Sequence, residues 1–367
     1  MKKRRIVLAS LLKPLNDPRM FEKMGVSLAQ SGRYEVHLIG YPSKEDMGVP
    51  TIRFHALPKF RRLSLGRIRA RLKVLGFTIK AKPELFIVTT HELLGVALLI
   101  RILFGVKIIY DVQENYWRNI MYTDAFPTGT RTIIASLVRF KEMIISPLIH
   151  HFILAEKGYL TELSFAENKC TVIENKCKLP AGFQREPTVG VIQLLFTGTI
   201  AESTGVFPAI NLAKKLHAAE PKIRLNIIGY CSQAHVHQKI NKEVSENKFI
   251  TLTGGNEFVP HGSILNAIAK ADFGIICYPM SPHIENKSPT KLYEYLACQL
   301  PILLQDHPPW AVICKPYNAS VAIDFEQLDT ESILKKIHSG SFYSAPPEGM
   351  TWSGEEEKLL ALVKAIF

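Results

Sequence analysis

Cysteines are few in this sequence, and none of them lies in a pattern typical of a metal site. The 367 residues include six cysteines, at positions 170, 177, 231, 277, 298 and 314, and no two of them form a Cys-x-x-Cys pair. Structural metal sites depend on such closely spaced ligands. The sequence therefore predicts reduced thiols in a cytoplasmic protein, with no metal.

Hydrophobic runs long enough to cross a membrane are also absent. The most apolar region, residues 85–106, contains His91, Glu92 and Arg101. A membrane-spanning helix needs about 20 mostly apolar residues, and charges within it are costly. The N-terminus imitates a secretion signal, but Lys13-Pro14 interrupts its apolar run and no small-residue cleavage site follows. We interpret that run as a buried first strand.

Acidic residues are scarce in the first half of the chain. Residues 1–180 contain 29 lysines and arginines against 15 aspartates and glutamates, whereas the remainder contains 16 against 18. The excess peaks in residues 59–82, where basic residues alternate with apolar ones. Such a stretch favours peripheral contact with an anionic membrane. A solvated surface is the alternative, and no nucleic-acid-binding module is visible, so we expect no nucleic-acid partner.

The length and the pattern of the chain predict two α/β domains. Short apolar runs alternate with helical patterns, which predicts parallel sheets covered by helices on both faces. Strands are expected at 5–10, 34–39, 52–57, 85–89, 107–112, 152–155 and 171–173, and then at 191–196, 224–228, 249–253, 273–277 and 301–304. Residues 180–190 are the expected connector, and an amphipathic helix closes the chain at 354–367.

The stretch Ser288-Pro289-Thr290-Lys291, continued to residue 297, is the most informative part of the sequence. Ser288 suits an N-cap and Pro289 suits the first helical position. The start of a helix attracts anions, and Lys291 adds a positive charge. Glu294 lies on the same face, where it can accept hydrogen bonds from sugar hydroxyls. An ordinary capped helix with a Lys–Glu pair is the alternative explanation.

Two further turns in the same half suit a nucleotide. Gly198 permits close approach of the backbone, and Thr199 and Thr204 supply hydroxyl and N–H groups for a phosphate. Two phosphate-suited turns in one domain suggest a diphosphate. Gly254 and Gly255 end another predicted strand, where paired glycines would let a flat base lie against the main chain; a plain turn is the alternative.

The order of these motifs resembles that of family 4 (group 1) glycosyltransferases of the two-domain GT-B type, over nearly the full chain. The matching pieces are Asp17-Pro18-Arg19, residues 107–112 with Gln113-Glu114, residues 172–175, 195–205, 288–303 and Thr351-Trp352 with the closing helix. The resemblance implies two Rossmann-like domains facing across a cleft. The acceptor domain is expected at 1–178, completed by a crossover helix at 354–367, and the donor domain at 190–350.

The same resemblance implies an activity. It is the transfer of a sugar from a nucleotide-diphosphate sugar to a glycan or lipid-linked acceptor, with retention, in cell-surface polysaccharide or glycoconjugate synthesis. No cofactor is implied, because the nucleotide sugar is a substrate. Localisation is expected to be cytoplasmic, at the inner face of the cell membrane.

The sequence departs from the family pattern at four positions. Thr199 and Thr204 stand where many members carry Arg and Lys, Asn286 where many carry Glu, and Gln113 where His is expected. Lys287 and Lys291 are therefore the cations assigned to the diphosphate. The resemblance assigns the N–H groups of Gly198–Thr199 and of Ser288–Lys291 to the diphosphate, Glu294 to the ribose, and Asn286 to the donor sugar. The catalytic candidates are Asn286, Lys291, Gln113 and Glu114.

Residues that follow predicted strands of the first domain are candidates for the acceptor side. They are Asp17, Arg19, His91 and Glu92, with Gln113 and Glu114 nearby. His91 is a candidate base, and a structural histidine is the alternative. Two other functions remain open: a non-catalytic donor-binding partner of another transferase, and a sugar-nucleotide epimerase, for which no convincing acid–base set is found.

Overall fold

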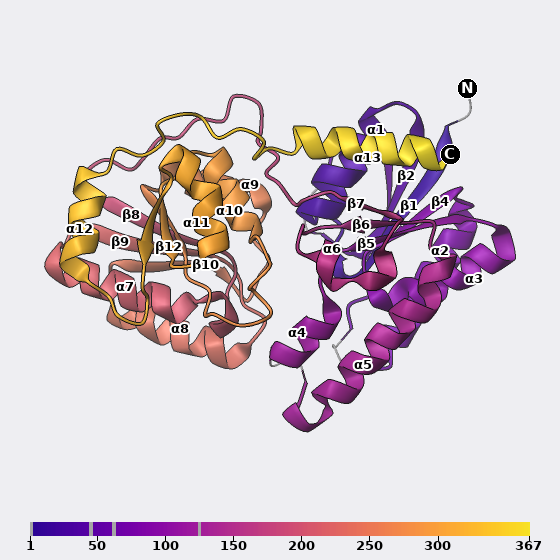
Figure 1. Cartoon of the computed structure of the whole chain (residues 1–367), viewed down its shortest axis with the longest axis horizontal. Coiled ribbons are helices and arrows are strands. Elements are labelled where there is room, and N and C mark those ends of the chain that lie inside the picture. Colours follow the sequence, from indigo (N-terminus) through magenta and orange to yellow (C-terminus); the bar gives the residue numbers. More distant parts are fainter. Residues whose placement is uncertain (1–2, 44–46, 61–63, 124–125) are drawn as a thin grey trace. The chain divides into compact units, whose positions relative to one another are not determined.

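The computed structural model describes residues 3–43, 47–60, 64–123 and 126–367. The chain divides into two compact units (Figure 1). Unit 1 comprises residues 1–178 and 352–367, and unit 2 comprises residues 179–351. Both are parallel α/β sheets of the Rossmann type, which confirms the predicted fold class.

Unit 1 is built on seven parallel strands in the order β3-β2-β1-β4-β5-β6-β7. Their residues are rich in Val, Ile, Leu and Phe because both faces of the sheet are covered. Side chains alternate between two cores: Val7 and Ala9 of β1 enter one, while Ile6 and Leu8 enter the other. The strands are β1 (Arg4–Pro14), β2 (Tyr34–Tyr41), β3 (Ile52–Ala56), β4 (Leu85–Val88), β5 (Lys107–Val112), β6 (His151–Leu154) and β7 (Cys170–Val172).

The helices of unit 1 lie on the two faces of this sheet. The first core receives α2 (Gly66–Ala81), α3 (Leu94–Phe104) and α5 (Thr128–Ile145). The second core receives the π-helical η1 (Pro18–Gly25), α1 (Val26–Gln30) and the last helix, α13 (Ser353–Ile366). Shorter elements complete the unit: η2 (His91–Leu93), α4 (Tyr116–Tyr122), η3 (Ser146–Leu148), α6 (Tyr159–Glu162) and η4 (Ser164–Ala166).

The closing helix α13 is fixed to unit 1 by both polar and apolar contacts. The buried indole of Trp352 donates from Nε1 to Ser27 Oγ at 3.0 Å, and Leu359 and Val363 are fully buried. The buried carboxylate of Glu355 accepts from the Glu174 N–H at 2.9 Å and pairs with Lys176 at 2.8 Å. The predicted return of the last helix to the first sheet is thereby confirmed.

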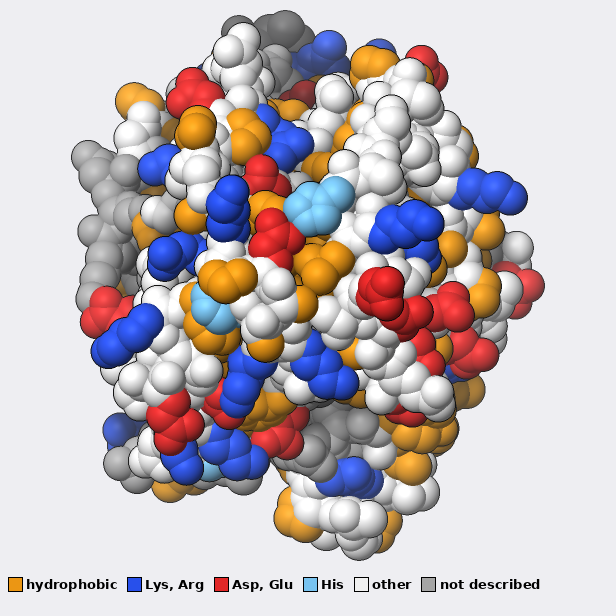
Figure 2. Space-filling view, turned by 90° about the vertical axis from the view of Figure 1, so that its left-hand side faces the viewer, with side chains coloured by type: hydrophobic (Ala, Val, Ile, Leu, Met, Phe, Trp, Pro, Cys, Tyr) orange, Lys and Arg blue, Asp and Glu red, His pale blue; other side chains and the backbone are white. Residues whose placement is uncertain are grey.

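Unit 2 is built on six parallel strands in the order β10-β9-β8-β11-β12-β13. The strands are β8 (Ile192–Thr199), β9 (Ile223–Tyr230), β10 (Ile250–Gly255), β11 (Phe273–Ile276), β12 (Ile302–Gln305) and β13 (Ser320–Ile323). One face carries α7 (Val206–Ala219), α8 (Ala234–Glu246) and α12 (Thr330–Ser339). The other elements are η5 (Glu202–Thr204), α9 (His261–Lys270), α10 (Thr290–Ala297), α11 (Pro308–Cys314) and η6 (Lys315–Tyr317). Basic and acidic side chains are interspersed on the face drawn in Figure 2.

Both sheets reverse their strand order at one place, between β1 and β4 in unit 1 and between β8 and β11 in unit 2. In open α/β sheets, ligands bind beyond the carboxyl ends of the strands at such a reversal. The two reversals therefore mark where a site is expected in each unit. None of the helices within the described ranges is long and apolar enough to cross a membrane.

Candidate functional site

Lys291 lies beside the strand reversal of unit 2. It is the second residue of α10, and its side chain points back to β8, where the ammonium nitrogen lies 4.1 Å from the centroid of the Phe196 ring. The same nitrogen lies 5.2 Å from the centroid of the Tyr278 ring, just after β11. Both rings attract a cation. Lys291 is only 6% exposed, so this cation is held in a largely apolar environment.

The ammonium group of Lys291 has no hydrogen-bond partner among the residues that the structure describes. Burial lowers its pKa from 10.5 to about 8, against a smaller raising effect of Cys277 and Glu294. A buried charge without a hydrogen bond is costly, and such groups are usually paired. An anion bound at the start of α10 would supply that partner.

The start of α10 differs from the prediction. The helix begins at Thr290, and its N-cap is Pro289, so Ser288 is not the N-cap that its sequence position suggested. Pro289 has φ −57° and ψ 137°, an extended conformation that keeps it outside the helix. A proline N-cap has no side-chain acceptor. Pro289 therefore offers no side-chain acceptor to the first N–H groups of α10.

Three glycines form a row across the strand ends next to this helix. Gly198 of β8 pairs with Gly229 of β9, which pairs with Gly254 of β10. All three have positive φ, at 90°, 154° and 90°. A Cβ on Gly229 would lie 1.7 Å from the Gly198 carbonyl oxygen, whereas a Cβ on Gly198 would meet no atom within 4 Å. The row is thus packed underneath and open at Gly198, where the predicted phosphate turn lies.

The two other glycines of this turn region are explained by packing. A Cβ on Gly255 would lie 2.6 Å from the His237 ring, and one on Gly205 would lie 1.9 Å from the Cys277 carbonyl oxygen. Packing against His237 therefore explains the glycine at position 255. The predicted contact of Gly254 and Gly255 with a base is a separate hypothesis. Because Cys277 also donates from Sγ to the Gly205 carbonyl at 3.0 Å, the loop after β8 is fixed to the end of β11.

The threonines that replace the expected cations have different surroundings. Thr199 is exposed at the end of β8. Thr204 donates its hydroxyl to the Thr199 carbonyl at 2.8 Å and accepts from the Ala201 N–H at 3.0 Å, so it closes the loop on itself. The loop 198–205 itself contains no arginine or lysine, the residue types that the resemblance led us to expect there. Two lysines outside the loop lie near it: Lys239 of α8 pairs with Glu202 at 3.1 Å, and Lys291 of α10 contacts Phe196 of β8.

Glu294 and Lys287, the other predicted donor residues, each contact a histidine. Glu294 is buried one turn after Lys291, and its Oε1 lies 3.2 Å from His261 Nε2 at the start of α9. Lys287 Nζ lies 3.1 Å from His283 Nε2 in the loop before α10. Asn286 is exposed in that same loop. His261 was not predicted. Its position at the start of the helix that follows the strand ending at Gly255 could have indicated that it lies near the site.

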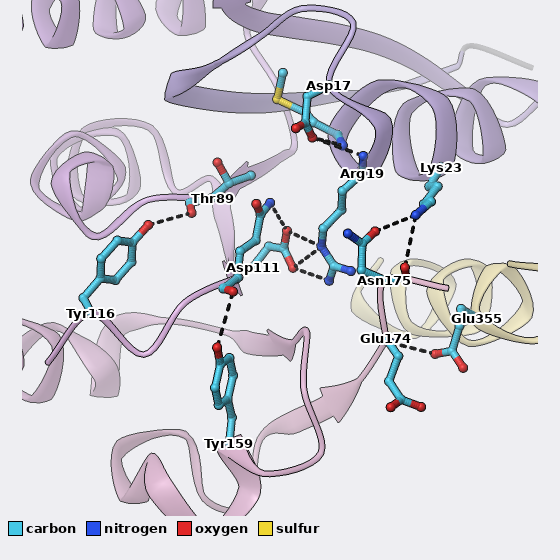
Figure 3. A network of polar contacts seen from close by, with 12 residues as sticks. Asp17, Arg19, Lys23, Thr89, Asp111, Tyr116, Tyr159, Glu174, Asn175 and Glu355 are labelled. Atoms are coloured by element: carbon cyan, nitrogen blue, oxygen red, sulfur yellow. Dashed lines mark hydrogen bonds and ion pairs between the residues drawn. The ribbon is translucent and has the colours of Figure 1, made fainter. Parts of the chain in front are cut away.

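In unit 1, Arg19 and Asp111 form a buried ion pair at the strand reversal (Figure 3). Arg19 follows β1 and donates from Nη2 to Asp111 Oδ1 at 2.6 Å and from Nε to Oδ2 at 3.0 Å. Gln113 donates from Nε2 to Asp111 Oδ2 at 2.7 Å. The structure thus brings two predicted residues, Arg19 and Gln113, onto one carboxylate that the prediction did not include.

Asp17 has a clear structural role in this network. Its Oδ1 accepts from the backbone N–H groups of Arg19 at 3.1 Å and Met20 at 2.9 Å, which caps η1. Asp17 also pairs with Lys13 at 3.5 Å. Glu114, next to Gln113, lies 3.5 Å from the Asn119 amide. The turn after β1 is therefore held in a defined conformation next to the end of β5.

His91 and Glu92 form a second cluster at the end of β4. Lys141 of α5 donates from Nζ to His91 Nδ1 at 2.8 Å, and the His91 ring packs edge-on against Tyr116. Burial, and then the Lys141 charge, lower the pKa of His91 to about 3. Such a histidine is a weak base at neutral pH. The buried carboxylate of Glu92 pairs with Arg67 and Arg71 of α2.

Glu142 of α5 is a buried acid that sequence reasoning missed. Tyr110 of β5 donates its hydroxyl to Glu142 Oε1 at 2.9 Å. Burial raises the pKa of Glu142 to about 7, although Arg139, Tyr110 and Lys141 act in the opposite direction. Glu142 directly follows Lys141, the residue that contacts His91, and its pKa of about 7 lies in the physiological range.

Comparisons with known proteins identify the fold. The structure of sucrose-phosphate synthase from Thermosynechococcus elongatus matches with a TM-score of 0.75 at 14% identity, covering 100% of this chain and 99% of that chain. HepE from Anabaena, in complex with UDP and glucose, matches at 0.68 and 11%, covering 98% and 99%. WaaG, a glycosyltransferase involved in lipopolysaccharide biosynthesis, matches at 0.67 and 11%, covering 96% and 94%.

These likenesses confirm the predicted GT-B fold over the whole chain. No protein-family model matches the sequence, and a search of curated proteins finds no match either. At 10–14% identity, these likenesses show the fold alone. The assignment of function therefore depends on the residues at the two strand reversals.

Proposed function

We propose that the protein is a glycosyltransferase that moves a sugar from a nucleotide-diphosphate sugar to a glycan or lipid-linked acceptor. The observation that carries this proposal is the buried ammonium of Lys291 near the start of α10, close to the open turn at Gly198. Among the described residues this ammonium has no hydrogen-bond partner. A diphosphate supplies the negative charge and the acceptor oxygens that the Lys291 ammonium and the backbone N–H groups of the turn can bind. The GT-B fold, seen with UDP in HepE, is consistent with this ligand.

The roles of the donor residues follow from the chemistry of sugar transfer. Departure of the nucleoside diphosphate places negative charge on the leaving oxygen, and fixed dipoles and cations stabilise it. We assign the N–H groups of Gly198–Thr199 and of Ser288–Lys291 to the diphosphate, with Lys291 and Lys287 as its cations. Glu294 is assigned to the ribose hydroxyls. Because His261 contacts Glu294, it positions this carboxylate.

Three further assignments complete the proposed donor site. Asn286 is assigned to the donor sugar, since it lies in the loop that leads to α10. Gly254 and Gly255 are assigned to the base. Thr204 is assigned to keeping the diphosphate loop in shape through its bond to the Thr199 carbonyl. We expect retention of the anomeric configuration and no requirement for a metal.

The acceptor is proposed to lie at the strand reversal of unit 1. Asp17, Arg19, Gln113 and Glu114 surround the end of β5, and His91 and Glu92 follow β4. One guanidinium nitrogen of Arg19, Nη1, is buried without a hydrogen-bond partner among the described residues, which makes it a candidate contact for an acceptor oxygen. The pKa of His91 favours a structural or hydrogen-bonding role over that of a base.

We propose cell-surface polysaccharide or glycoconjugate synthesis as the setting, with the protein in the cytoplasm at the inner face of the membrane. The basic stretch 59–82 is proposed to provide peripheral membrane contact. Within it, Arg69, Lys73 and Lys80 of α2 are exposed, while Arg61 and Arg62 lie outside the described residues.

The deciding experiment has two steps. Thermal-shift screening against nucleoside diphosphates and nucleotide sugars identifies the donor, because a bound ligand stabilises the fold. The donor is then incubated with acceptor candidates, and transfer, hydrolysis and epimerisation are measured together. Transfer supports the proposal. Binding without turnover identifies a non-catalytic partner of another transferase, and conversion of the sugar without an acceptor identifies an epimerase.

A further inference from the structure

Helix α5 exposes an apolar stripe where a surface helix normally carries polar residues. Ile133, Leu137, Phe140 and Ile144 recur at helical spacing and are 58–64% exposed, and Met143 beside them is 51% exposed. Away from this stripe, α5 buries Ala135 and Val138 in a small core with Ile120 of α4, and Ile145 in the first core of unit 1. The helix is thus apolar on two sides. An exposed patch of this kind marks an interaction site.

The stripe continues onto the neighbouring helices. Helix α3 packs between α5 and α2 on the same face of the unit 1 sheet (Figure 1). Its last residues, Ile102, Leu103 and Phe104, are 55–67% exposed. On α2, Ile68 and Leu72 are 53% and 62% exposed. The outer surface of the α2–α3–α5 layer is therefore apolar across all three helices.

The charges of this layer are almost all positive. The three helices contain one acidic residue, Glu142, and it is buried. They contain nine basic residues: Arg67, Arg69, Arg71, Lys73, Lys80, Arg101, Arg131, Arg139 and Lys141. Arg67 and Arg71 are paired with Glu92, whereas Arg69, Lys73 and Lys80 are exposed. The surface thus combines exposed apolar side chains with an unbalanced positive charge.

The positive charge around the exposed apolar side chains distinguishes between the possible partners of this surface. A second copy of the chain would bring two positively charged faces together, which is unfavourable. An anionic lipid bilayer offers both complements, since its headgroups are negative and its interior is apolar. Unit 2 carries no such excess, with 14 basic and 15 acidic residues in positions 179–351.

We infer that the outer face of the α2–α3–α5 layer docks on an anionic bilayer, with the α5 stripe inserted at the boundary between headgroups and acyl chains. The exposed basic residues of α2 contact the headgroups. This inference rests on the proposed function and extends it: residues 59–82 supply charge, while the apolar anchor lies outside them, on α5. The surface would hold unit 1 at the membrane that contains a lipid-linked acceptor.

The test uses the full-length protein and vesicles of phosphatidylcholine with and without phosphatidylglycerol. Leu137→Ser/Phe140→Ser removes the centre of the stripe, and Arg69→Gln/Lys73→Gln removes exposed charge. Val189→Ser/Val312→Ser, which changes residues of unit 2 that are 96% and 68% exposed, is the matched control. We expect the stripe variant to bind anionic vesicles about tenfold more weakly at low and at high salt. The charge variant should lose binding mainly at low salt.

Several outcomes overturn the inference. They are parent protein that does not bind anionic vesicles, a stripe variant that binds like the control, and a parent dimer that the stripe variant converts to monomer. Nucleotide-induced thermal stabilisation, measured on every variant, reports separately on folding and on the proposed donor site. Vesicle binding without any nucleotide response supports the docking surface and contradicts the proposed function. The converse result contradicts the docking surface alone.

Discussion

The ammonium nitrogen of Lys291 lies 4.1 Å from the centroid of the Phe196 ring, and this contact joins the start of α10 to the end of β8. The lysine is charged and buried, and within the described parts of the chain it has no hydrogen-bond partner. Aromatic rings replace only part of the hydration that a buried ammonium loses. The ligand-free protein therefore carries a free-energy cost that a bound anion would relieve.

Replacing this lysine should separate stability from binding. Lys291→Met removes the buried charge and keeps the length of the side chain. We expect nucleoside diphosphate affinity to fall by about 1–3 kcal/mol, the range for a charge-assisted hydrogen bond. The ligand-free variant should be at least as stable as the parent in urea. Calorimetry and urea unfolding measure the two effects, with Lys270→Met, at an exposed lysine, as the control.

The pKa of Lys291 also predicts how both quantities depend on pH. Its folded value of about 8 lies below the unfolded value of 10.5, so the unfolded chain binds more protons between these pH values. The stability of the ligand-free protein should therefore gain a rising contribution from pH 8 to pH 10.5. Nucleotide affinity should fall above pH 8 as the ammonium deprotonates. Neither pH dependence should remain in Lys291→Met, and their persistence there would assign them to other groups.

Glu294 is expected to contribute to nucleotide binding through its charge. Glu294→Gln preserves the shape of the side chain but weakens its hydrogen bonds to hydroxyl donors, so we expect a loss of about 1–3 kcal/mol in nucleotide affinity. His261→Gln should produce a smaller loss in the same direction, because His261 contacts the carboxylate rather than the ligand. Calorimetry on both variants tests this order. Unchanged affinity in Glu294→Gln would overturn the assignment of the ribose site.

Glu142 predicts a different pH dependence in unit 1. Its pKa is about 7 in the folded protein and 4.5 in the unfolded chain, so the folded state binds more protons between these values. Stability should decrease from pH 4.5 to pH 7, by up to about 3 kcal/mol from this group. Glu142→Gln stays neutral and retains an acceptor for the Tyr110 hydroxyl. Urea unfolding at pH 5 and pH 8 should therefore show a gain for Glu142→Gln over the parent at pH 8 only.

The buried pair of Arg19 and Asp111 predicts strong coupling. Arg19→Leu leaves Asp111, which is fully buried, without its cation, and we expect a loss of about 3–5 kcal/mol in stability. Adding Asp111→Leu removes the uncompensated charge and should recover much of that loss. A double-mutant cycle in urea measures the coupling. Additive losses in the two single variants would show that the pair contributes no specific interaction.

The sequence predicted those parts of the fold that depend on local pattern. The strand at 107–112 coincides with β5, because its run of β-branched and aromatic residues is bounded by charged and polar positions. The start of α10 was predicted one residue early, since the conformation of Pro289 is set by the loop that precedes it. Helix α5 was not predicted, although its apolar residues recur at helical spacing.

The candidate site was predictable in outline and not in its contacts. Lys291 was chosen because it lies near the start of a helix, which is a local property. Its burial between Phe196 and Tyr278 depends on residues far away in the sequence that meet only in the folded sheet. For the same reason, Asp111 and Glu142 were missed, because each is defined by a partner on another element. Asp111 was not chosen even though it lies in the strand 107–112, which matches the family pattern.

The chain leaves unit 1 after Lys178 and returns to it at Trp352. These two points lie next to each other in unit 1, because the backbone N–H of Trp352 donates to the Cys177 carbonyl at 2.7 Å. Unit 2 is therefore an insertion within unit 1, and its last residue is synthesised before α13 exists. During translation, unit 2 is complete in sequence while Trp352 and α13, which unit 1 buries, are still missing. Unit 1 can complete its core only after the whole of unit 2 has been synthesised.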